Sequence, residues 1–131
     1  MTTEATNQTR ILILDDDKFL LDMYSVKFSQ AGYAIESCFS VHEALEVIRK
    51  GYDPAAILFD ITMPGEDGFA FLETLNAEKL APHARRIALT NQGNDSDKQH
   101  AESLGVHRYC IKASMIPSEV VQMVKEELAK K

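Results

Sequence analysis

Five polar side chains stand at the ends of short apolar runs in the sequence, namely Asp15 with Asp16, then Asp60, Thr90 and Lys112. Uninterrupted apolar runs of this length are typical of parallel strands that are buried on both faces. Parallel strands end at the same edge of a sheet, and in open α/β sheets ligands bind outside that edge. We therefore expect the five side chains to gather into one site.

The residue types indicate what chemistry this site could do. Carboxylates brought together oppose one another's ionisation, so Asp15, Asp16 and Asp60 need a counter-charge. Oxygen ligands without a neighbouring His or Cys suit Mg²⁺, which also binds several waters and a phosphate oxygen. The ammonium of Lys112 and the hydroxyl of Thr90 suit the remaining oxygens of a phosphoryl group. The pattern indicates Mg²⁺-dependent phosphoryl chemistry.

The elements that position these residues alternate between strand and helix. Strands are expected at residues 11–14, 33–39, 56–60, 86–90 and 106–111, and a segment with apolar residues at helical spacing follows each one. This alternation predicts parallel strands joined by right-handed crossovers. We expect an α/β fold, in which a doubly wound five-stranded parallel sheet has helices on both faces as a three-layer sandwich.

Local signals mark several of these helices. The first predicted helix has an apolar stripe at Leu20, Met23, Tyr24, Phe28 and Ala31, and the last has one at Val120, Val121, Val124 and Leu128. Ser40 with Glu43 predicts a capping box. The helix expected from Asn94 or Ser96 to Gly105 has only Ala101 and Leu104 as clearly apolar residues. We expect it to be the most weakly held helix of the domain.

Length and composition exclude several classes of protein. The 131 residues suit one domain, and we expect a disordered leader at 1–9 followed by the domain at 10–131. A net charge of −6 argues against direct nucleic-acid binding. We expect no membrane insertion and a cytoplasmic location, because no signal-peptide core or long apolar span is present. Cys38 and Cys110 are expected to be reduced structural thiols, and the four histidines to have surface or capping roles.

The spacing of these motifs resembles the receiver domain of two-component response regulators, typified by the single-domain chemotaxis regulator. The intervals between Asp16, Asp60, Thr90 and Lys112 match that family, and DITMPGEDG resembles its loop after the phosphoacceptor. Tyr109 stands where the family has a switch aromatic. The resemblance spans residues 10–129 and implies the flavodoxin-like strand order 2-1-3-4-5.

The resemblance implies a phosphoacceptor and a metal site. Asp60 would take a phosphoryl group from the phosphohistidine of a histidine kinase or phosphotransfer protein. Asp16, Asp60 and the backbone carbonyl of Thr62 would bind Mg²⁺ directly, and Asp15 would act largely through a metal-bound water. Asp17 could be a further ligand, although the helix dipole alone favours an acid at the start of a helix.

The resemblance also implies a switch and a binding function. Lys112 would pair with the phosphoryl oxygens, while Thr90 and Tyr109 would move and alter a face that binds a downstream protein. Tyr109 could instead be an ordinary half-buried strand aromatic. The chain would be no enzyme beyond assisting its own phosphorylation and dephosphorylation.

The sequence also allows other functions, and it departs from the family pattern at two positions. A phosphohydrolase of the haloacid-dehalogenase type would need an acid at position 62, where this chain has Thr62, and a flavodoxin-like carrier would need a phosphate loop after the first strand. The chain could also be a receiver fragment of a larger hybrid kinase or regulator. Ala113 replaces the usual proline after Lys112, and Asn91 is larger than the residue common there.

Overall fold

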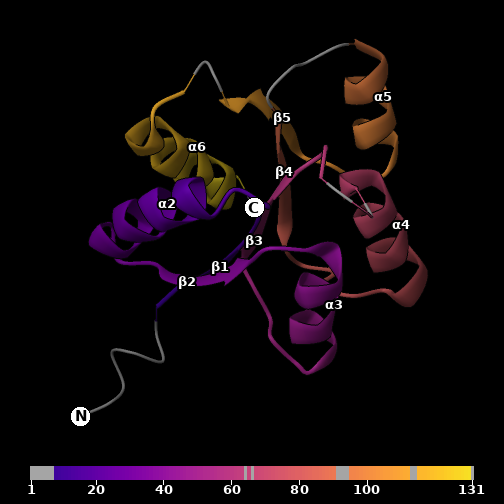
Figure 1. The fold of residues 1–131 in the computed structure, drawn as a ribbon, viewed down its shortest axis with the longest axis horizontal. Helices are drawn as coiled ribbons and strands as arrows, with labels where there is room; N and C mark the ends of the chain where they lie inside the picture. Colours follow the sequence, from indigo (N-terminus) through magenta and orange to yellow (C-terminus); the bar gives the residue numbers. More distant parts are fainter. Residues whose placement is uncertain (1–7, 64, 66, 91–94, 113–114, 131) are drawn as a thin grey trace.

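The computed structural model describes residues 8–63, 65, 67–90, 95–112 and 115–130, in which strands and helices alternate (Figure 1). The strands are β1 (Arg10–Leu14), β2 (Ala34–Cys38), β3 (Ala56–Asp60), β4 (Arg85–Thr90) and β5 (Arg108–Ile111). The helices are α2 (Lys18–Gln30), α3 (Val41–Arg49), α4 (Gly68–Glu78), α5 (Asp95–Ser103) and α6 (Pro117–Ala129). The predicted alternation is confirmed.

The strands form one parallel sheet in the order β2-β1-β3-β4-β5. Helices α2 and α6 cover one face of this sheet, and α3, α4 and α5 cover the other (Figure 1). The doubly wound, three-layer architecture and the strand order 2-1-3-4-5 are therefore both confirmed. From β1 the chain continues to β2 on one side of the sheet, and from β3 it continues to β4 on the other side. Because β1 and β3 pair with each other, their carboxyl ends lie side by side.

Each strand contributes to two separate cores because successive side chains point to opposite faces. In β1, Ile11 and Ile13 pack toward α2 and α6, whereas Leu12 and Leu14 pack toward α3 and α4. All four are at most 1% exposed, and burying one such side chain contributes about 1.5–3 kcal/mol. This double burial explains why the central strands β1 and β3 have uninterrupted apolar runs in the sequence.

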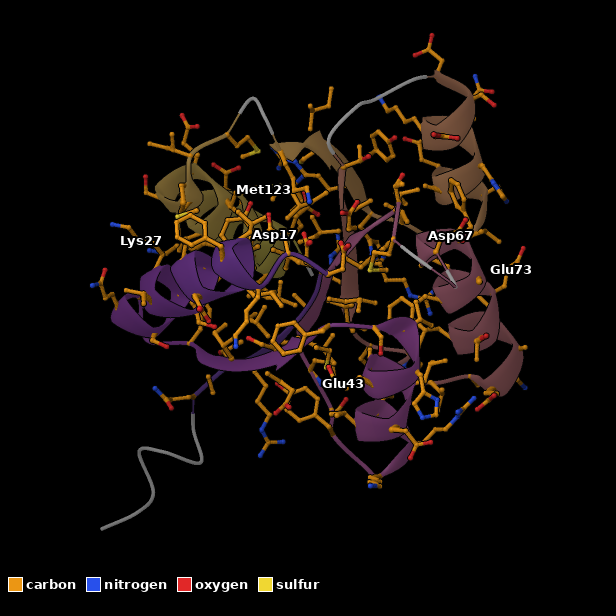
Figure 2. The ribbon with its side chains drawn as sticks, in the orientation of Figure 1. Asp17, Lys27, Glu43, Asp67, Glu73 and Met123 are labelled. Carbon is orange, nitrogen blue, oxygen red and sulfur yellow. The ribbon has the colours of Figure 1, made fainter. Side chains whose placement is uncertain are left out.

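Side chains cap the amino ends of α2, α3 and α4, and the cap of α3 at Ser40 is the one that the sequence predicts. Asp17 caps α2 by accepting a hydrogen bond from the backbone N–H of Leu20, and Asp67 caps α4 in the same way. Both acids lie at the amino ends of their helices in Figure 2. Ser40 accepts from the N–H of Glu43, as the capping box predicts. The carboxylate of Glu43 accepts the N–H of Phe39, one residue earlier than a standard box requires.

The inner faces of two helices differ from the predicted stripes. Helix α2 buries Leu21 with Tyr24 and Phe28, whereas Leu20 and Met23 are only half-buried and Ala31 is exposed. Helix α6 buries Met123 and Glu127, while Val121 and Leu128 are half-buried. Each buried face is turned by less than one residue position from the predicted stripe, because the packing angle of a helix on its sheet is a tertiary property that apolar spacing leaves open.

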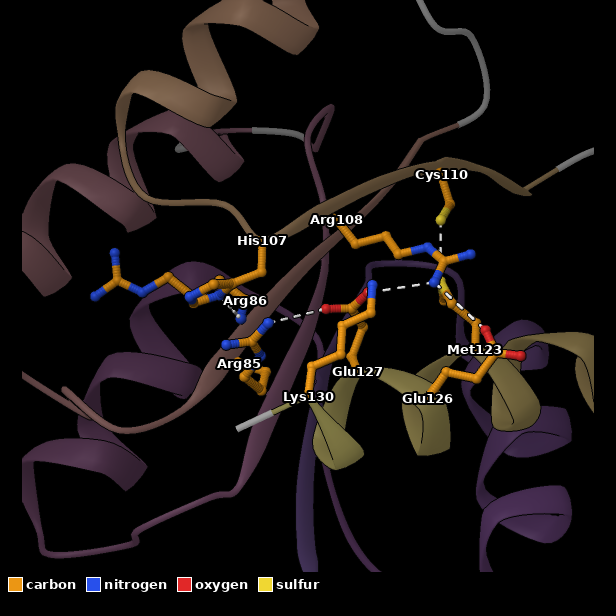
Figure 3. A network of polar contacts seen from close by, with 9 residues as sticks. All are labelled: Arg85, Arg86, His107, Arg108, Cys110, Met123, Glu126, Glu127 and Lys130. Carbon is orange, nitrogen blue, oxygen red and sulfur yellow. Dashed lines mark hydrogen bonds and ion pairs between the residues drawn. The ribbon is translucent and has the colours of Figure 1, made fainter.

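The burial of a charged residue in α6 was not predicted. Glu127 is 1% exposed and accepts hydrogen bonds from Arg85 at 3.1 Å, Arg108 at 3.2 Å and Lys130 at 2.9 Å (Figure 3). Burial alone would raise the pKa of Glu127, but these hydrogen bonds and charges lower it to about 2. The carboxylate therefore stays ionised and ties the end of α6 to β4 and β5.

Helix α5 has the narrow apolar face that its composition predicts. Ala101 is its buried residue, and Leu104 just beyond it is half-buried. Residues 1–7 of the expected leader, Asn91, the possible cap Asn94 and the Lys112–Ala113 peptide bond lie outside the described residues. Within the described part of the chain, no helix is long and apolar enough to cross a membrane.

Gly68 allows α4 to begin against the backbone of the Asp60 strand. Its N–H donates to the carbonyl of Ile61 at 2.9 Å, and an added Cβ would lie 2.7 Å from the backbone oxygen of Asp60. That Cβ would also lie 2.9 Å from the Cα of Ile61. Both atoms belong to the backbone, so neither can move aside without shifting the strand end.

We therefore predict that Gly68→Ala lowers the free energy of unfolding by about 1–3 kcal/mol, the usual cost of forcing extra atoms into a packed site. Urea denaturation measures the change. Glu73→Ala, at an exposed position of the same helix, is the control and should stay within about 0.5 kcal/mol of wild type. Equal stability of Gly68→Ala and wild type would contradict the close packing at Asp60.

Candidate functional site

A depression of about 440 Å³ lies at the carboxyl edge of the sheet, where the sequence predicts the site. Its lining residues are Asp15, Asp16, Asp17, Leu20, Asp60, Thr62 and Lys112. Asp15 follows β1 directly and Asp60 is the last residue of β3, so the pairing of these two central strands places both acids together. Asp15 and Asp60 are 2% and 3% exposed, while Asp16 is exposed. The predicted acids therefore converge.

Lys112 bridges the two buried carboxylates. Its Nζ atom lies 2.8 Å from Oδ2 of Asp15 and 3.0 Å from Oδ2 of Asp60. The side chain of Lys112 is only 8% exposed, so both contacts are shielded from water. Charge-assisted hydrogen bonds of this length are stronger than neutral ones. The sequence predicts the lysine at this site, and the structure adds that it binds both acids at once.

The second oxygen of each buried carboxylate is held by a backbone N–H. Oδ1 of Asp15 accepts from the N–H of Asp17 at 2.9 Å, and Oδ1 of Asp60 accepts from the N–H of Thr62 at 3.1 Å. In each case an aspartate bonds to the backbone two residues further on, which is a common local turn. Each carboxylate is thereby fixed by one local bond and by the shared ammonium of Lys112.

The carboxylates are close enough to hold a divalent cation. Ligand oxygens of Asp15, Asp16 and Asp60 all lie within 4.8 Å of one another. Octahedral Mg²⁺ with ligands at about 2.1 Å places neighbouring oxygens about 3.0 Å apart and opposite oxygens about 4.2 Å apart. Small side-chain movements would reach this geometry. An acidic cluster with no His or Cys fits the hard cation Mg²⁺.

Burial and charge shape the ionisation of the site. Burial raises the pKa of Asp60, and although the hydrogen bond and charge of Lys112 oppose this, the carboxylate of Asp15 adds to the rise. Burial would lower the pKa of Lys112, but its hydrogen bonds to Asp15 and Asp60 raise it above the ordinary value. Lys112 is therefore a permanent cation, whereas ionised Asp60 still gains from any further positive charge.

The remaining predicted residues surround this centre. Thr90 is the buried last residue of β4, the strand next to β3, and Tyr109 is half-buried on β5 against the core on the α5 side. Among the described residues, neither one lines the depression. Thr62 does line it, with an exposed side chain and its N–H on Asp60. Thr90 and Tyr109 thus lie near the acidic centre and outside it.

The structure also assigns residues that the sequence left open. The side chain of Asp17 caps α2, and its backbone N–H donates to Asp15. Both groups of Asp17 thus have a structural role. Leu20 lines the depression, although its spacing in the sequence predicts a position in the core. Apolar periodicity could not distinguish the two positions, because Leu20 and Leu21 are adjacent and chemically equivalent.

Most of the chain is similar in sequence to proteins of one known family. Residues 11–125 match the family model described as response regulator receiver domain. The transcriptional regulatory protein ResD of Bacillus subtilis (strain 168) is 30% identical over 123 residues, which cover 93% of this chain and 49% of ResD. HprR of Escherichia coli (strain K12), also a transcriptional regulatory protein, is 29% identical over 91% of this chain and 51% of its own length. This chain spans about half the length of these curated relatives.

Solved structures show the same fold. The CheY-like receiver domain protein of Methanospirillum hungatei JF-1 superposes with a TM-score of 0.85 at 27% identity, over 95% of this chain and 96% of that one. The chemotaxis protein CheY4 of Vibrio cholerae gives a TM-score of 0.83 at 23% identity, over 91% of this chain and 98% of that one. At that lower identity, the second likeness shows the fold alone.

We predict that Lys112→Met destabilises the metal-free protein by about 3 kcal/mol at neutral pH, because two buried carboxylates lose their shared counter-charge. Urea denaturation in the presence of a chelator measures the loss. Lys112 lowers the pKa of Asp60, so its removal raises that pKa further, and protonation of Asp60 in the variant should offset part of the loss as the pH falls.

Lys98→Met on α5 is the matched control, because it removes the same charge from an exposed position. It should change stability by no more than about 0.5 kcal/mol. If Lys112→Met were as stable as wild type at neutral pH, the bridge between the two carboxylates would contribute nothing to folding.

Proposed function

Because the chain belongs to the family of response regulator receiver domains, we propose that it is a phosphoacceptor module that receives a phosphoryl group on Asp60. The donor is the phosphohistidine of a histidine kinase or of a phosphotransfer protein. The observation that carries the proposal is the pairing of Lys112 with both Asp15 and Asp60 in an acidic depression at the carboxyl edge of the sheet.

The residues around Asp60 suit a nucleophile. Its Oδ1 atom is held by the N–H of Thr62, so the carboxylate has a fixed orientation relative to the opening of the depression. In the transfer, a bond from an Asp60 oxygen to phosphorus forms while the phosphorus–nitrogen bond of the phosphohistidine breaks. The ammonium of Lys112 then pairs with a phosphoryl oxygen in place of the Asp60 oxygen. Phosphoryl transfer depends mainly on such positioning and charge neutralisation.

Mg²⁺ is the cofactor of this proposal. Following the family resemblance, Asp16, Asp60 and the carbonyl of Thr62 would bind it directly, with Asp15 acting largely through water. The bound ion supplies positive charge that offsets the negative charge of the incoming phosphoryl group. Lys112 and the ion would contact the same carboxylates, so the ammonium of Lys112 lowers the affinity for Mg²⁺, and bound Mg²⁺ weakens the ion pairs of Lys112.

The switch would transmit phosphorylation to a protein-binding face. Thr90 would turn toward a phosphoryl oxygen, and Tyr109 would follow it inward from β5. The face is formed by α5, β5 and α6, and its exposed or half-buried polar residues include Lys98, Gln99 and Arg108. The narrow apolar face of α5 supports this choice, since a weakly packed helix shifts at low cost.

The partners follow from the same proposal. The output is a contact with a downstream protein rather than with nucleic acid, because the chain has a net charge of −6. We place it in the cytoplasm, where free thiols such as those of Cys38 and Cys110 remain reduced. Its relatives are about twice as long as this chain, which also suits a receiver that is part of a larger regulator. It assists its own phosphorylation and dephosphorylation and acts on no other substrate.

We predict that Mg²⁺ stabilises the unphosphorylated protein. At ten times its dissociation constant, a ligand contributes about 1.4 kcal/mol, which raises the melting temperature of a domain of this size by about 3–5 °C. Asp16→Ala should lose most of this shift, whereas Asp53→Ala, at an exposed loop position, should keep it. A melting temperature that stays constant over a millimolar Mg²⁺ titration of wild type would refute the metal site.

We further predict that acetyl phosphate with Mg²⁺ adds one phosphoryl group to wild type and none to Asp60→Asn. Intact-protein mass spectrometry detects the added mass, and hydroxylamine should remove it because the product is an acyl phosphate. Asp53→Asn is the control for the loss of a carboxylate and should be labelled as wild type is. Labelling of Asp60→Asn to the same extent would place the acceptor elsewhere.

A non-covalent mimic of the phosphoryl group tests the proposed output face. Amide hydrogen exchange of the wild type, compared with and without the phosphoryl mimic beryllofluoride, should change in α5 and β5. Changes confined to the segments that follow β1 and β3 would leave phosphoacceptance intact and reject the assigned face.

A further inference from the structure

At the amino edge of the sheet, opposite the acidic depression, His107 and Arg86 form a reciprocal pair. The backbone N–H of His107 donates to the carbonyl of Arg86 at 2.8 Å, and the backbone N–H of Arg86 donates to Nδ1 of the His107 ring at 2.9 Å (Figure 3). The regular pairing of β4 with β5 starts at the next residues, Ile87 and Arg108. The ring of His107 therefore extends the parallel ladder by one rung.

This rung depends on the charge state of one side chain. Nδ1 accepts a hydrogen bond only when it carries no proton, which leaves the proton of the neutral ring on Nε2. A protonated imidazole has N–H donors at both nitrogens, so Nδ1–H would face the N–H of Arg86. The bond that starts the β4–β5 ladder would be replaced by a contact between two donors.

The surroundings of His107 make protonation costly without preventing it. The residue is exposed, so water and protons reach the ring. Burial of part of the ring and the cations Arg85 and Arg86 lower the pKa of His107, while Glu127 opposes this from α6. Glu127 is already shared among Arg85, Arg108 and Lys130. Among the described residues, these are the charged groups of β4 and α6 that act on the histidine.

Arg86 also resists displacement from the ring. Its guanidinium donates to Oδ1 of Asn76 at 2.6 Å and to the carbonyl of Leu104 at 3.1 Å, and the residue is 8% exposed. Arg86 is thus anchored to α4 and to the turn after α5. A contact between two donors would therefore be relieved on the side of His107, at the start of β5.

We propose that His107 is an acid-sensitive latch, whose protonation releases the amino end of β5 from β4. The latch needs no phosphoryl group, because its parts lie at the edge of the sheet opposite Asp60. It acts on the strand that carries Tyr109 and ends beside Lys112. Mild acid would therefore loosen the proposed output face from the edge that the phosphoryl group does not reach.

The pH range follows from the sign of the linkage. The closed latch favours neutral His107, whereas in the open state the ring titrates at its ordinary pKa of 6.5. As the pH falls through that value, the open state binds more protons and the latch weakens, until the closed state also titrates. For a closed state that stays neutral, the opening equilibrium rises by up to about tenfold between about pH 7.5 and about pH 5.5.

Amide hydrogen exchange followed by NMR tests this in the unphosphorylated protein. Once corrected for intrinsic exchange, the protection of the Arg86 amide should fall by several-fold, and by up to about tenfold, between these two pH values in wild type. In His107→Asn it should change by less than about twofold, because Asn places a carbonyl acceptor where Nδ1 lies and does not titrate. His83→Asn, at an exposed loop position, is the matched control and should behave as wild type does.

Two results would overturn the latch. One is protection of the Arg86 amide that is constant with pH in wild type, and the other is an equal pH course in His107→Asn and wild type. If His107→Asn does not fold, NMR titration of the wild-type ring decides. The expected result is a His107 pKa below 6.5, with the fall in Arg86 protection beginning near pH 6.5 and levelling off near the pKa of the ring. Titration of the ring with no change at Arg86 rejects the proposal.

Discussion

The bridge from Lys112 to Asp15 and Asp60 is the interaction on which the site depends. One ammonium faces two buried carboxylates, so the site contains more negative than positive charge, and exposed Asp16 adds to this excess. An excess of negative charge favours a cation at such a site, and the ammonium of Lys112 reduces the repulsion between the carboxylates.

The fold holds the carboxylates together through the buried elements that carry them. β1 and β3 are central strands buried on both faces, and they hold Asp15 and Asp60 at the same edge. Gly68 lets α4 start directly against the backbone of Asp60. The backbone N–H groups of Asp17 and Thr62 then orient the two carboxylates. The site is therefore positioned mainly by backbone, which side-chain motion disturbs little.

The opposite edge of the sheet has the contrasting electrostatic arrangement. Glu127 there binds three cations, and the anchored guanidinium of Arg86 bonds to neutral acceptors. These groups fix α6, β4 and the start of β5 to one another. Strand β5 thus begins beside His107, at the edge where the charge of Glu127 is compensated by three cations. It ends beside Lys112, at the edge where carboxylates outnumber the cation. A change at either end acts on the same short edge strand.

The sequence alone predicts the alternation of strands and helices, the cap at Ser40 and the gathering of the acids with Lys112, and the family resemblance adds the strand order. These follow from local patterns, since strand burial, capping and motif spacing are all readable along the chain. Only the tertiary structure decided that Lys112 bonds to both acids, that α2 buries Leu21, that Glu127 is inside and that His107 pairs with Arg86. Lys112 and Asp15 are 97 residues apart in sequence. Contacts of this kind depend on the distance and solvent exposure of charges after packing, and no periodicity in the sequence encodes either quantity.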